Sequence, residues 1–455
     1  MTAAEFRLVV AQFPALRAKR ACSLRLNLLR GDHRSPVPMK FPAILSLGLI
    51  LSVFSATAAP REWTDQATGR KISADFVSLN GDQVTLLING KEYNLPVARL
   101  SAEDQAYLKV VGDAPAMPKE APEQVSPVAA KPGGNSKVVG PIDVEGSHYY
   151  YYIPASAKTG RKLPLLTYTG ALGADGGTVR SMIEGAEVCG WMVACCVESS
   201  NRLDPEVNQT HLAKVVKHLI ANQPVDAKRL YFSGHSGGAR MAFRGCKRLD
   251  GAGVIAYIAG AQDDEISRTD RYFIISGATD YNRYDTATTF AAARKVSAYR
   301  MHTEGHTNGP GWLMAEGMIW LQSCWDVDSQ QMTPERAEFE AAAISWIEKT
   351  KSSAPHRAAW WARFLKTQGV TPAHQAKIAS LDTEFSQSPI NLAYIKGISD
   401  IEEMADDVLA KISKFSEKGH TAPEIQKRCD KLLAEHAQTP WIKDVLTALK
   451  EKTGG

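Results

Sequence analysis

A serine at a tight turn is the first residue of this sequence that could do chemistry. Residues 229–241 read RLYFSGHSGGARM, so a short apolar run meets a glycine-rich turn that is followed by good helix formers. The pattern predicts a strand, a turn with Ser236 at its apex, and a helix. Gly234 and Gly238 leave room for strand and helix to pass each other, since neither carries a Cβ atom. At such an apex the hydroxyl lies beside a helix N-terminus, where free N–H groups favour a developing oxyanion. The sequence therefore predicts a nucleophilic serine.

A nucleophilic serine needs a base, and His306 is the predicted one. It lies in a glycine-rich loop, HTEGHTNGP, that follows a predicted strand at residues 299–301. From such a loop an imidazole can reach a serine hydroxyl. His302 is the alternative, but it still belongs to the strand and is expected to pack. His211 and His218 are seven residues apart on a predicted helix, and we expect them on a solvated face.

A carboxylate must orient that histidine, and Asp280 is the predicted one. Residues 273–280 read FIISGATD, an apolar strand that ends in a loop of small residues. Asp280 would hold the tautomer of His306 and stabilise its charged form. Asp285 is the alternative, although it lies deeper in the next predicted helix.

Two backbone N–H groups are predicted to bind the oxyanion that forms when a serine attacks a carbonyl group. One belongs to Gly237, the residue after the nucleophile. The other is expected in the loop GALGADGG at residues 170–177, whose small side chains let a ligand approach the backbone. Within this loop we assign the donor to Ala171.

Alternating strands and helices predict how these residues are positioned. Apolar strands are expected at residues 163–169, 191–197, 230–232, 254–258, 273–275 and 299–301, and helices at 178–188, 207–222, 237–249, 286–296 and 312–322. The aromatic segment 148–154 is expected to be an edge strand. This alternation is typical of an α/β fold with a doubly wound, mostly parallel sheet, in which active sites form at the carboxyl ends of the strands.

Residues 147–349 resemble the α/β-hydrolase superfamily, and within it the secreted esterases grouped with polyhydroxyalkanoate depolymerases and feruloyl or acetylxylan esterases. The resemblance is carried by YYIP at 151–154, KLPL at 162–165, the turn around Ser236, GATD at 277–280 and the Gly-His pair at 305–306. It implies a nucleophile elbow and the catalytic order serine, acid, histidine. The sequence departs from the superfamily at Thr169-Gly170, where a His-Gly pair is common.

The first 58 residues are interpreted as an upstream segment and a signal peptide. Residues 39–60 read MKFPAILSLGLILSVFSATAAP: a lysine, an apolar run too short to span a bilayer comfortably, and small residues that fit a cleavage site. A secreted or periplasmic location follows, with no stable membrane span after cleavage, and a retained anchor is the alternative. Residues 1–38 are arginine-rich and patternless, so Met39 competes with Met1 as the start of translation. Without residues 1–58 the net charge of +4 becomes slightly negative, which argues against a nucleic-acid partner.

Residues 59–111 are predicted to form a separate small β-barrel module. Short strands at 71–79, 83–88 and 92–97 alternate with the turns NGD and NG, and one or two helical turns follow at 101–111. The letters LSAEDQ at 100–105, together with Trp63 and Gly69-Arg70, resemble the first Sla homology domain, which in endocytic adaptors binds short peptides. A peptide or an envelope component is therefore the expected partner. A proline- and alanine-rich linker is expected at 112–140.

Helices alone are predicted after the hydrolase-like domain, which we place at residues 141–350. In residues 353–455 apolar side chains recur at helical spacing, which is typical of packing faces, so we expect a small helical domain. Six cysteines follow residue 58. In an exported protein an even number permits disulfides, whose pairing the sequence leaves open.

Together these residues predict an exported serine hydrolase that cleaves carboxylic esters through an acyl-serine. The expected substrate is a small-molecule or polymeric ester, and no metal or organic cofactor is implied. A serine peptidase of the same fold is one alternative. The other is a catalytically inactive hydrolase-fold protein that binds the envelope or a polysaccharide, and the altered Thr169-Gly170 pair is its best support.

Overall fold

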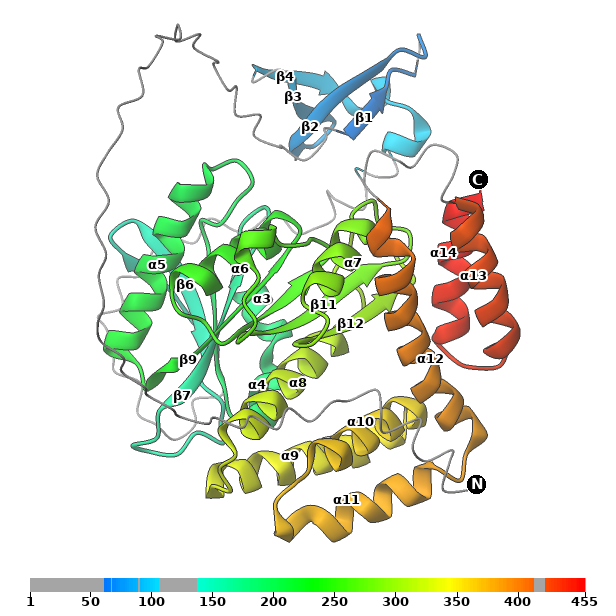
Figure 1. The fold of residues 1–455 in the computed structure, drawn as a ribbon. Helices are drawn as coiled ribbons and strands as arrows, with labels where there is room; N and C mark the ends of the chain where they lie inside the picture. The colour runs from blue at the N-terminus through cyan, green and yellow to red at the C-terminus, as the bar shows by residue number, and fades with distance from the viewer. Residues whose placement is uncertain are drawn as a thin grey trace, which may run out of the picture. The chain divides into compact units, whose positions relative to one another are not determined.

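The structure is a computed structural model that describes residues 61–108, except 67, 89–90 and 106–107, and residues 137–412 and 422–454. They belong to two compact units, Met1–Lys119 and Glu120–Gly455 (Figure 1). The predicted signal peptide and most of the predicted linker lie outside the described residues. Across the ranges just given, none of the helices has the length and apolar character needed to cross a membrane.

The first unit contains a four-stranded antiparallel sheet in the order β1-β2-β3-β4. Its elements are β1 (Arg61–Thr64), β2 (Lys71–Asn80), β3 (Gln83–Ile88), β4 (Lys91–Pro96) and the short 3-10 helix η1 (Val97–Arg99). Trp63 is fully buried and donates its indole N–H to the carbonyl oxygen of Ala74 at 2.9 Å. It packs in a small core with Val84, Leu86 and Leu100. The predicted small β module is therefore confirmed.

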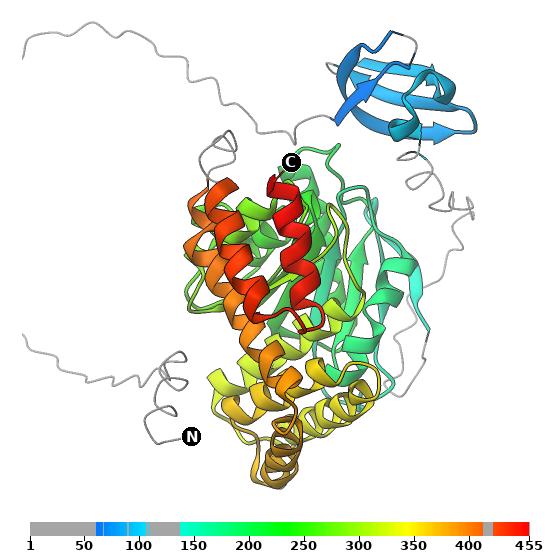
Figure 2. The ribbon, with the colours of Figure 1, turned by 90° about the vertical axis from the view of Figure 1, so that its right-hand side faces the viewer.

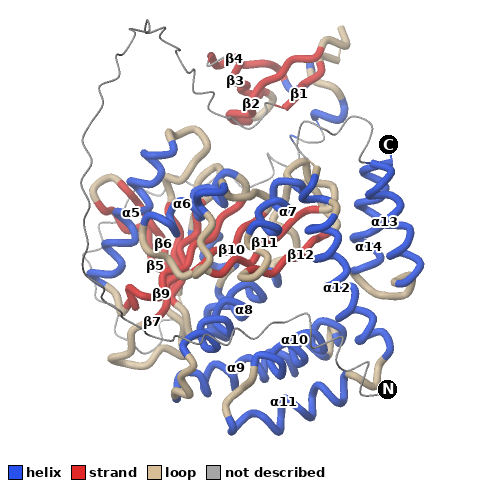
Figure 3. The backbone as a smooth tube through the Cα atoms, in the orientation of Figure 1, coloured by secondary structure: helices blue, strands red, loops and turns tan. Residues whose placement is uncertain are grey.

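The second unit is built on an eight-stranded sheet in the order β12-β11-β10-β9-β7-β8-β6-β5 (Figure 3). The strands are β5 (Val139–Val144), β6 (Ser147–Tyr152), β7 (Leu163–Thr169), β8 (Met192–Cys196), β9 (Val225–His235), β10 (Gly253–Tyr257), β11 (Arg271–Gly277) and β12 (Ser297–His302). Strands β7 to β12 are parallel, whereas β5 and β6 pair antiparallel at one edge. The predicted doubly wound, mostly parallel sheet is confirmed. The expectation that segment 148–154 is the edge strand is wrong, because β5 pairs with β6 and is itself the edge strand. The sequence did not predict β5, because it contains a glycine and a proline and resembles the end of the linker.

Helices cover both faces of this sheet (Figure 1). On one face lie α5 (Pro205–Asn222), α6 (Gly237–Arg248) and α7 (Arg283–Ala292), and on the other lie α3 (Gly176–Ser181), α4 (Ile183–Cys189) and α8 (Trp312–Ser329). The interior strand β10 is buried along its whole length, and its adjacent residues Ile255 and Ala256 belong to opposite hydrophobic cores. This burial on both sides explains why its sequence is continuously apolar.

The direction of winding reverses between β7 and β9, which are neighbours in the sheet. The chain leaves β7 for α3 and α4 on one face, and leaves β9 for α6 on the opposite face. Loops that diverge from adjacent parallel strands open a crevice at their carboxyl ends. The turn with Ser236 and the loop with Ala171 are the two loops that flank this point.

Helices continue to the end of the described chain: α9 (Pro334–Lys351), α10 (Pro355–Gln368), α11 (Pro372–Phe385), α12 (Pro389–Asp407), η3 (Leu409–Lys411), α13 (Ala422–Glu435) and α14 (Ile442–Gly454). Four of them, α9 to α12, begin with proline, whose fixed φ suits a first helical turn. Figure 2 shows α12, α13 and α14 side by side. Because α12 packs against α7 and β12, these helices share the hydrophobic core of the sheet.

Arg300 on β12 links three of the surrounding helices. Its side chain is only 3% exposed. The guanidinium lies 3.3 Å from a carboxylate oxygen of Glu402 on α12, 4.0 Å from one of Glu316 on α8, and 4.2 Å from the ring centre of Trp360 on α10. A buried cation needs such partners, since an unpaired charge in the interior is strongly unfavourable.

The six cysteines of the second unit are free thiols, and no disulfide joins them in the described part of the chain. All are buried except Cys324, which is half-buried. The adjacent Cys195 and Cys196 lie in opposite cores of the sheet, so they face away from each other as neighbours on a strand must.

Candidate active site

Ser236 occupies the turn between β9 and α6, as predicted. Its backbone has φ 56° and ψ −121°, a conformation that residues with a side chain rarely adopt. Backbone strain of this kind persists only where the surrounding structure enforces it, and it is common at functional sites. The turn places the serine at the carboxyl end of β9 and directly before the first turn of a helix.

Close packing of backbone atoms enforces this turn. A Cβ atom on Gly238 would lie 2.0 Å from the carbonyl oxygen of Thr169, and one on Gly234 would lie 2.4 Å from the carbonyl carbon of Gly238. Both glycines are therefore required sterically. Thr169 also donates its hydroxyl to the carbonyl oxygen of Gly238 at 2.7 Å. Thr169, which occupies the position where a histidine is common, thus stabilises the turn.

The three predicted catalytic side chains form one chain of hydrogen bonds. Ser236 Oγ lies 2.8 Å from His306 Nε2, and His306 Nδ1 lies 2.8 Å from Asp280 Oδ2. Asp280 is buried, and an ionised carboxylate only accepts hydrogen bonds, so Nδ1 carries the proton and Nε2 accepts from the serine hydroxyl. This is the arrangement in which an imidazole activates a serine.

The alternative residues are held elsewhere. Asp285 accepts hydrogen bonds from Arg240 at 2.9 Å and from the backbone N–H of Gly260 at 3.1 Å. His302 is fully buried on β12, and burial lowers its pKa. The structure therefore places Asp280 and His306 next to the serine, whereas the alternatives Asp285 and His302 lie elsewhere.

His235, the residue before the nucleophile, lies beside the base. Its ring centre is 5.3 Å from that of His306. Burial, and then the charge of His306, lower the pKa of His235 to about 4. It is therefore neutral at neutral pH and adds no second positive charge next to His306.

The helix α5 carries His211 and His218, which are partly exposed and whose ring nitrogens contact the sheet. His211 Nδ1 lies 2.8 Å from Ser147 Oγ, and His218 Nδ1 lies 3.0 Å from the hydroxyl of Tyr149. The predicted solvated face is therefore covered in part, because polar atoms of β6 supply partners that the helix pattern does not disclose.

Hydrogen bonds hold the loop with Ala171 in place. Ser199 Oγ donates to the carbonyl oxygen of Gly170 at 2.9 Å, and the N–H of Asn201 donates to the carbonyl oxygen of Ala171 at 2.8 Å. In a trans peptide C=O and N–H point in opposite directions, so the N–H of Ala171 points away from Ser199. Among the described hydrogen bonds, neither this N–H nor that of Gly237 is a donor.

Sequence reasoning missed two side chains at this site. The ring of Tyr281 stacks on His306, with centres 4.4 Å apart and planes at 18°. The side chain of Asn201 lies against Gly237, where a Cβ atom would be 1.7 Å from Asn201 Oδ1. Tyr281 follows Asp280 directly in sequence, and this adjacency was the one available signal.

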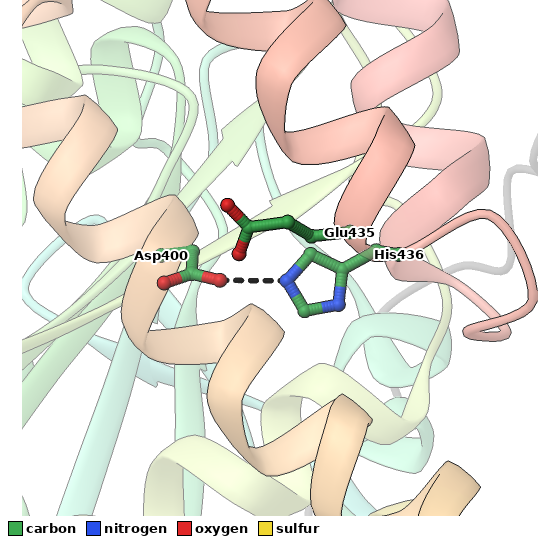
Figure 4. A group of neighbouring side chains, drawn as sticks. All are labelled: Asp400, Glu435 and His436. Atoms are coloured by element: carbon green, nitrogen blue, oxygen red, sulfur yellow. Dashed lines mark hydrogen bonds and ion pairs between the residues drawn. The ribbon is translucent and has the colours of Figure 1, made fainter.

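A second polar cluster, Asp400, Glu435 and His436, has ligand atoms close enough to surround a cation (Figure 4). His436 Nε2 lies 2.6 Å from Asp400 Oδ2. The ammonium of Lys396 donates to Asp400 at 2.6 Å and to Glu435 at 2.8 Å. Because the lysine already supplies the positive charge, the cluster is best described as an ion-pair network.

One comparison with known protein families concerns the first unit. Residues 54–114 match the family described as SLA1 homology domain 1, SHD1, which confirms the resemblance of the β module. A comparison with curated protein sequences finds no match.

Three solved structures are similar to part of this chain. Est1E from Butyrivibrio proteoclasticus has 14% identity and a TM-score of 0.34, covering 42% of this chain and 100% of its own. An α/β serine hydrolase without lid from Xanthomonas campestris has 16% identity and a TM-score of 0.31, covering 45% and 99%. S-formylglutathione hydrolase from Staphylococcus aureus has 12% identity and a TM-score of 0.34, covering 42% and 98%. At such values the function of this chain must be argued from its own residues.

Proposed function

We propose that the protein is a serine hydrolase that cleaves carboxylic esters through an acyl-serine intermediate. The observation that carries the proposal is the chain of hydrogen bonds from Asp280 through His306 to Ser236. These residues lie after β11, β12 and β9, at the carboxyl ends of parallel strands. An inactive binding protein has no physical need to keep all three in this arrangement.

Each group has a defined role in the proposed reaction. Ser236 Oγ attacks the ester carbonyl carbon while His306 Nε2 takes its proton, and Asp280 stabilises the imidazolium. The N–H groups of Gly237 and Ala171 bind the oxyanion of the tetrahedral intermediate. The C–O bond to the alcohol then breaks, and the alkoxide leaves with the proton from Nε2. A water molecule repeats the sequence and releases the acid.

Labelling with a fluorophosphonate tests the nucleophile. The full chain and its Ser236→Ala variant are treated with the probe, and the adduct is located by mass spectrometry. We expect one adduct, on Ser236, that is absent from the variant. If the folded chain takes no label, the hydrolase proposal fails and an inactive binding protein becomes the better hypothesis.

The preference for esters is tested separately. Short acyl, feruloyl and polyester substrates are compared with a peptide amide that has the same acyl group. We expect ester hydrolysis that is lost in Ser236→Ala. Faster cleavage of the amide would favour a serine peptidase of the same fold.

We also propose that the protein is exported, because residues 39–60 have the pattern of a signal peptide. The β module would then hold the enzyme near a peptide or an envelope component. Mass spectrometry of the N-terminus of the exported protein tests this, and we expect it to begin near residue 59. A mature protein that begins at Met1 would contradict cleavage.

A further inference from the structure

Tyr281 has a position that the three catalytic residues do not require. Its side chain is 56% exposed, although large aromatic side chains are usually buried. The next residue, Asn282, is anchored, since its side chain donates to the carbonyl oxygen of Ile258 at 2.9 Å and its N–H donates to Asp280 Oδ1. The backbone on both sides of Tyr281 is thus held by the acid and by the sheet, and the ring is presented to His306.

The hydroxyl of Tyr281 lies at the reactive nitrogen of the base. It is 2.9 Å from His306 Nε2, the atom that Ser236 Oγ also approaches, at 2.8 Å. The two rings are stacked at 18°, so the phenol approaches the imidazole from its face, whereas the lone pair of Nε2 lies in the ring plane. The lone pair of Nε2 therefore accepts the hydrogen bond from Ser236, and the hydroxyl of Tyr281 lies beside Nε2 above the ring.

The path of the proton on His306 Nε2 indicates which substrate atom can contact the hydroxyl of Tyr281. After Ser236 is acylated, the proton on Nε2 must pass to the oxygen of the departing alcohol, which must come within hydrogen-bond reach of Nε2. The Tyr281 hydroxyl is already within that reach. The leaving oxygen and the phenol are therefore neighbours when the C–O bond breaks, and the attacking water later takes the same place.

We propose that Tyr281 is a catalytic residue that donates a hydrogen bond to the leaving-group oxygen in acylation and to the attacking water in deacylation. The inference rests on the hydrolase activity proposed above. Tyr281 transfers no proton: the proton from Ser236 travels through Nε2 to the alcohol, and the phenol O–H stabilises the negative charge that develops on that oxygen. In deacylation the same O–H orients the water whose proton passes to Nε2.

The test compares leaving groups in the Tyr281→Phe variant of the full chain. Two esters share one acyl group, with ethanol as a poor leaving group and p-nitrophenol as a good one. A poorer leaving group carries more charge in the transition state and depends more on the hydrogen bond. We expect kcat/KM to fall about tenfold or more for the ethyl ester and less than about threefold for the p-nitrophenyl ester.

Two further measurements separate the explanations. Tyr281→Phe should still be labelled at Ser236 by the fluorophosphonate, which shows that the nucleophile is intact. If only stacking matters, Tyr281→Phe behaves as the wild type and Tyr281→Ala loses activity equally on both esters, and that result overturns the inference. An equal loss on both esters in Tyr281→Phe overturns it as well.

The controls distinguish the failure of this inference from the failure of the proposed function. Removal of another exposed phenol hydroxyl, in Tyr93→Phe of the β module, should change neither kcat/KM value. A wild-type chain that takes no label at Ser236 overturns the hydrolase proposal and this inference together. Labelling with unchanged ethyl-ester kinetics in Tyr281→Phe overturns the inference alone.

Discussion

The two sides of the catalytic centre are held in place by different kinds of interaction. On the nucleophile side, backbone packing fixes Ser236, since a Cβ atom on Gly238 would lie 2.0 Å from the carbonyl oxygen of Thr169. On the base side, Asp280 and His306 lie in loops and are held through side-chain hydrogen bonds. Substitutions of the residues that support Ser236 on the first side, other than of the serine itself, should therefore act mainly on stability, and those on the second side mainly on turnover.

The largest effect is expected on the base side, from Asp280→Asn. The amide can present an N–H to Nδ1, which favours the wrong tautomer of His306 and removes the charge that stabilises the imidazolium. We expect kcat to fall about ten thousand-fold with ester substrates, while the thermal midpoint changes little. Steady-state kinetics and thermal unfolding of the same samples check both parts.

Asp285→Asn is the matched control for this prediction. The same change five residues later keeps an acceptor for Arg240 and for the backbone N–H of Gly260. Its kcat should stay within about tenfold of the wild type. Equal losses in the two variants would show that Asp280 has no special role.

The next effect is on the nucleophile side, from Gly238→Ala. The added methyl group meets backbone atoms that cannot rotate away, so strand and helix must separate. We expect the free energy of unfolding to fall by about 3 kcal/mol, measured by denaturant titration. Gly311→Ala, where a Cβ atom would meet nothing within 4 Å, should change it by less than about 0.5 kcal/mol.

A smaller effect should follow from Thr169→Val, which keeps the shape but removes the hydroxyl. The carbonyl oxygens of Gly238 and Ser233 lose a donor, and we expect a loss of about 1–3 kcal/mol in the free energy of unfolding. Activity of the folded variant should change less than in Asp280→Asn. A variant that is fully stable but inactive would break the proposed division between the two sides.

The last effect concerns pH and His235. Its pKa is about 4 in the folded protein against 6.5 for an ordinary histidine, so the unfolded chain binds more protons between these values. The contribution of His235 to the free energy of unfolding is therefore fully present above pH 6.5, and it is lost as the pH falls towards 4. In His235→Phe the loss over this window should be smaller by about 3 kcal/mol. His302 and the carboxylates titrate in both proteins, so identical pH profiles would contradict the assignment.

The sequence was sufficient to predict the fold class and the residues that the structure brings together. Ser236, Asp280 and His306 each follow an apolar strand and lie in a loop rich in glycine or other small residues, which are strong local signals. Their proximity follows from the rule that parallel strands direct their carboxyl ends to one edge. Their catalytic roles remain predictions until the variants are measured.

The rest depends on contacts between distant segments. β9 begins at Val225, although only residues 230–232 were predicted, because exposed polar side chains at its start hide the strand pattern. The stacking of Tyr281 on His306 joins two loops, and no periodicity predicts such a contact. The pairing of Asp285 with Arg240 likewise joins α7 to α6.

The charge cluster around Arg300 joins the C-terminal helices to the sheet, so these helices are expected to be needed for folding. A chain shortened at residue 352 keeps Ser236, Asp280 and His306, but it removes Glu402 and Trp360 from the buried guanidinium and uncovers apolar side chains on β12 and α7. Such a truncation should aggregate or be degraded by proteases although it keeps all three proposed catalytic residues. The C-terminal helices are thus an integral part of the scaffold of the proposed site, and any transfer of this site to another protein must include them.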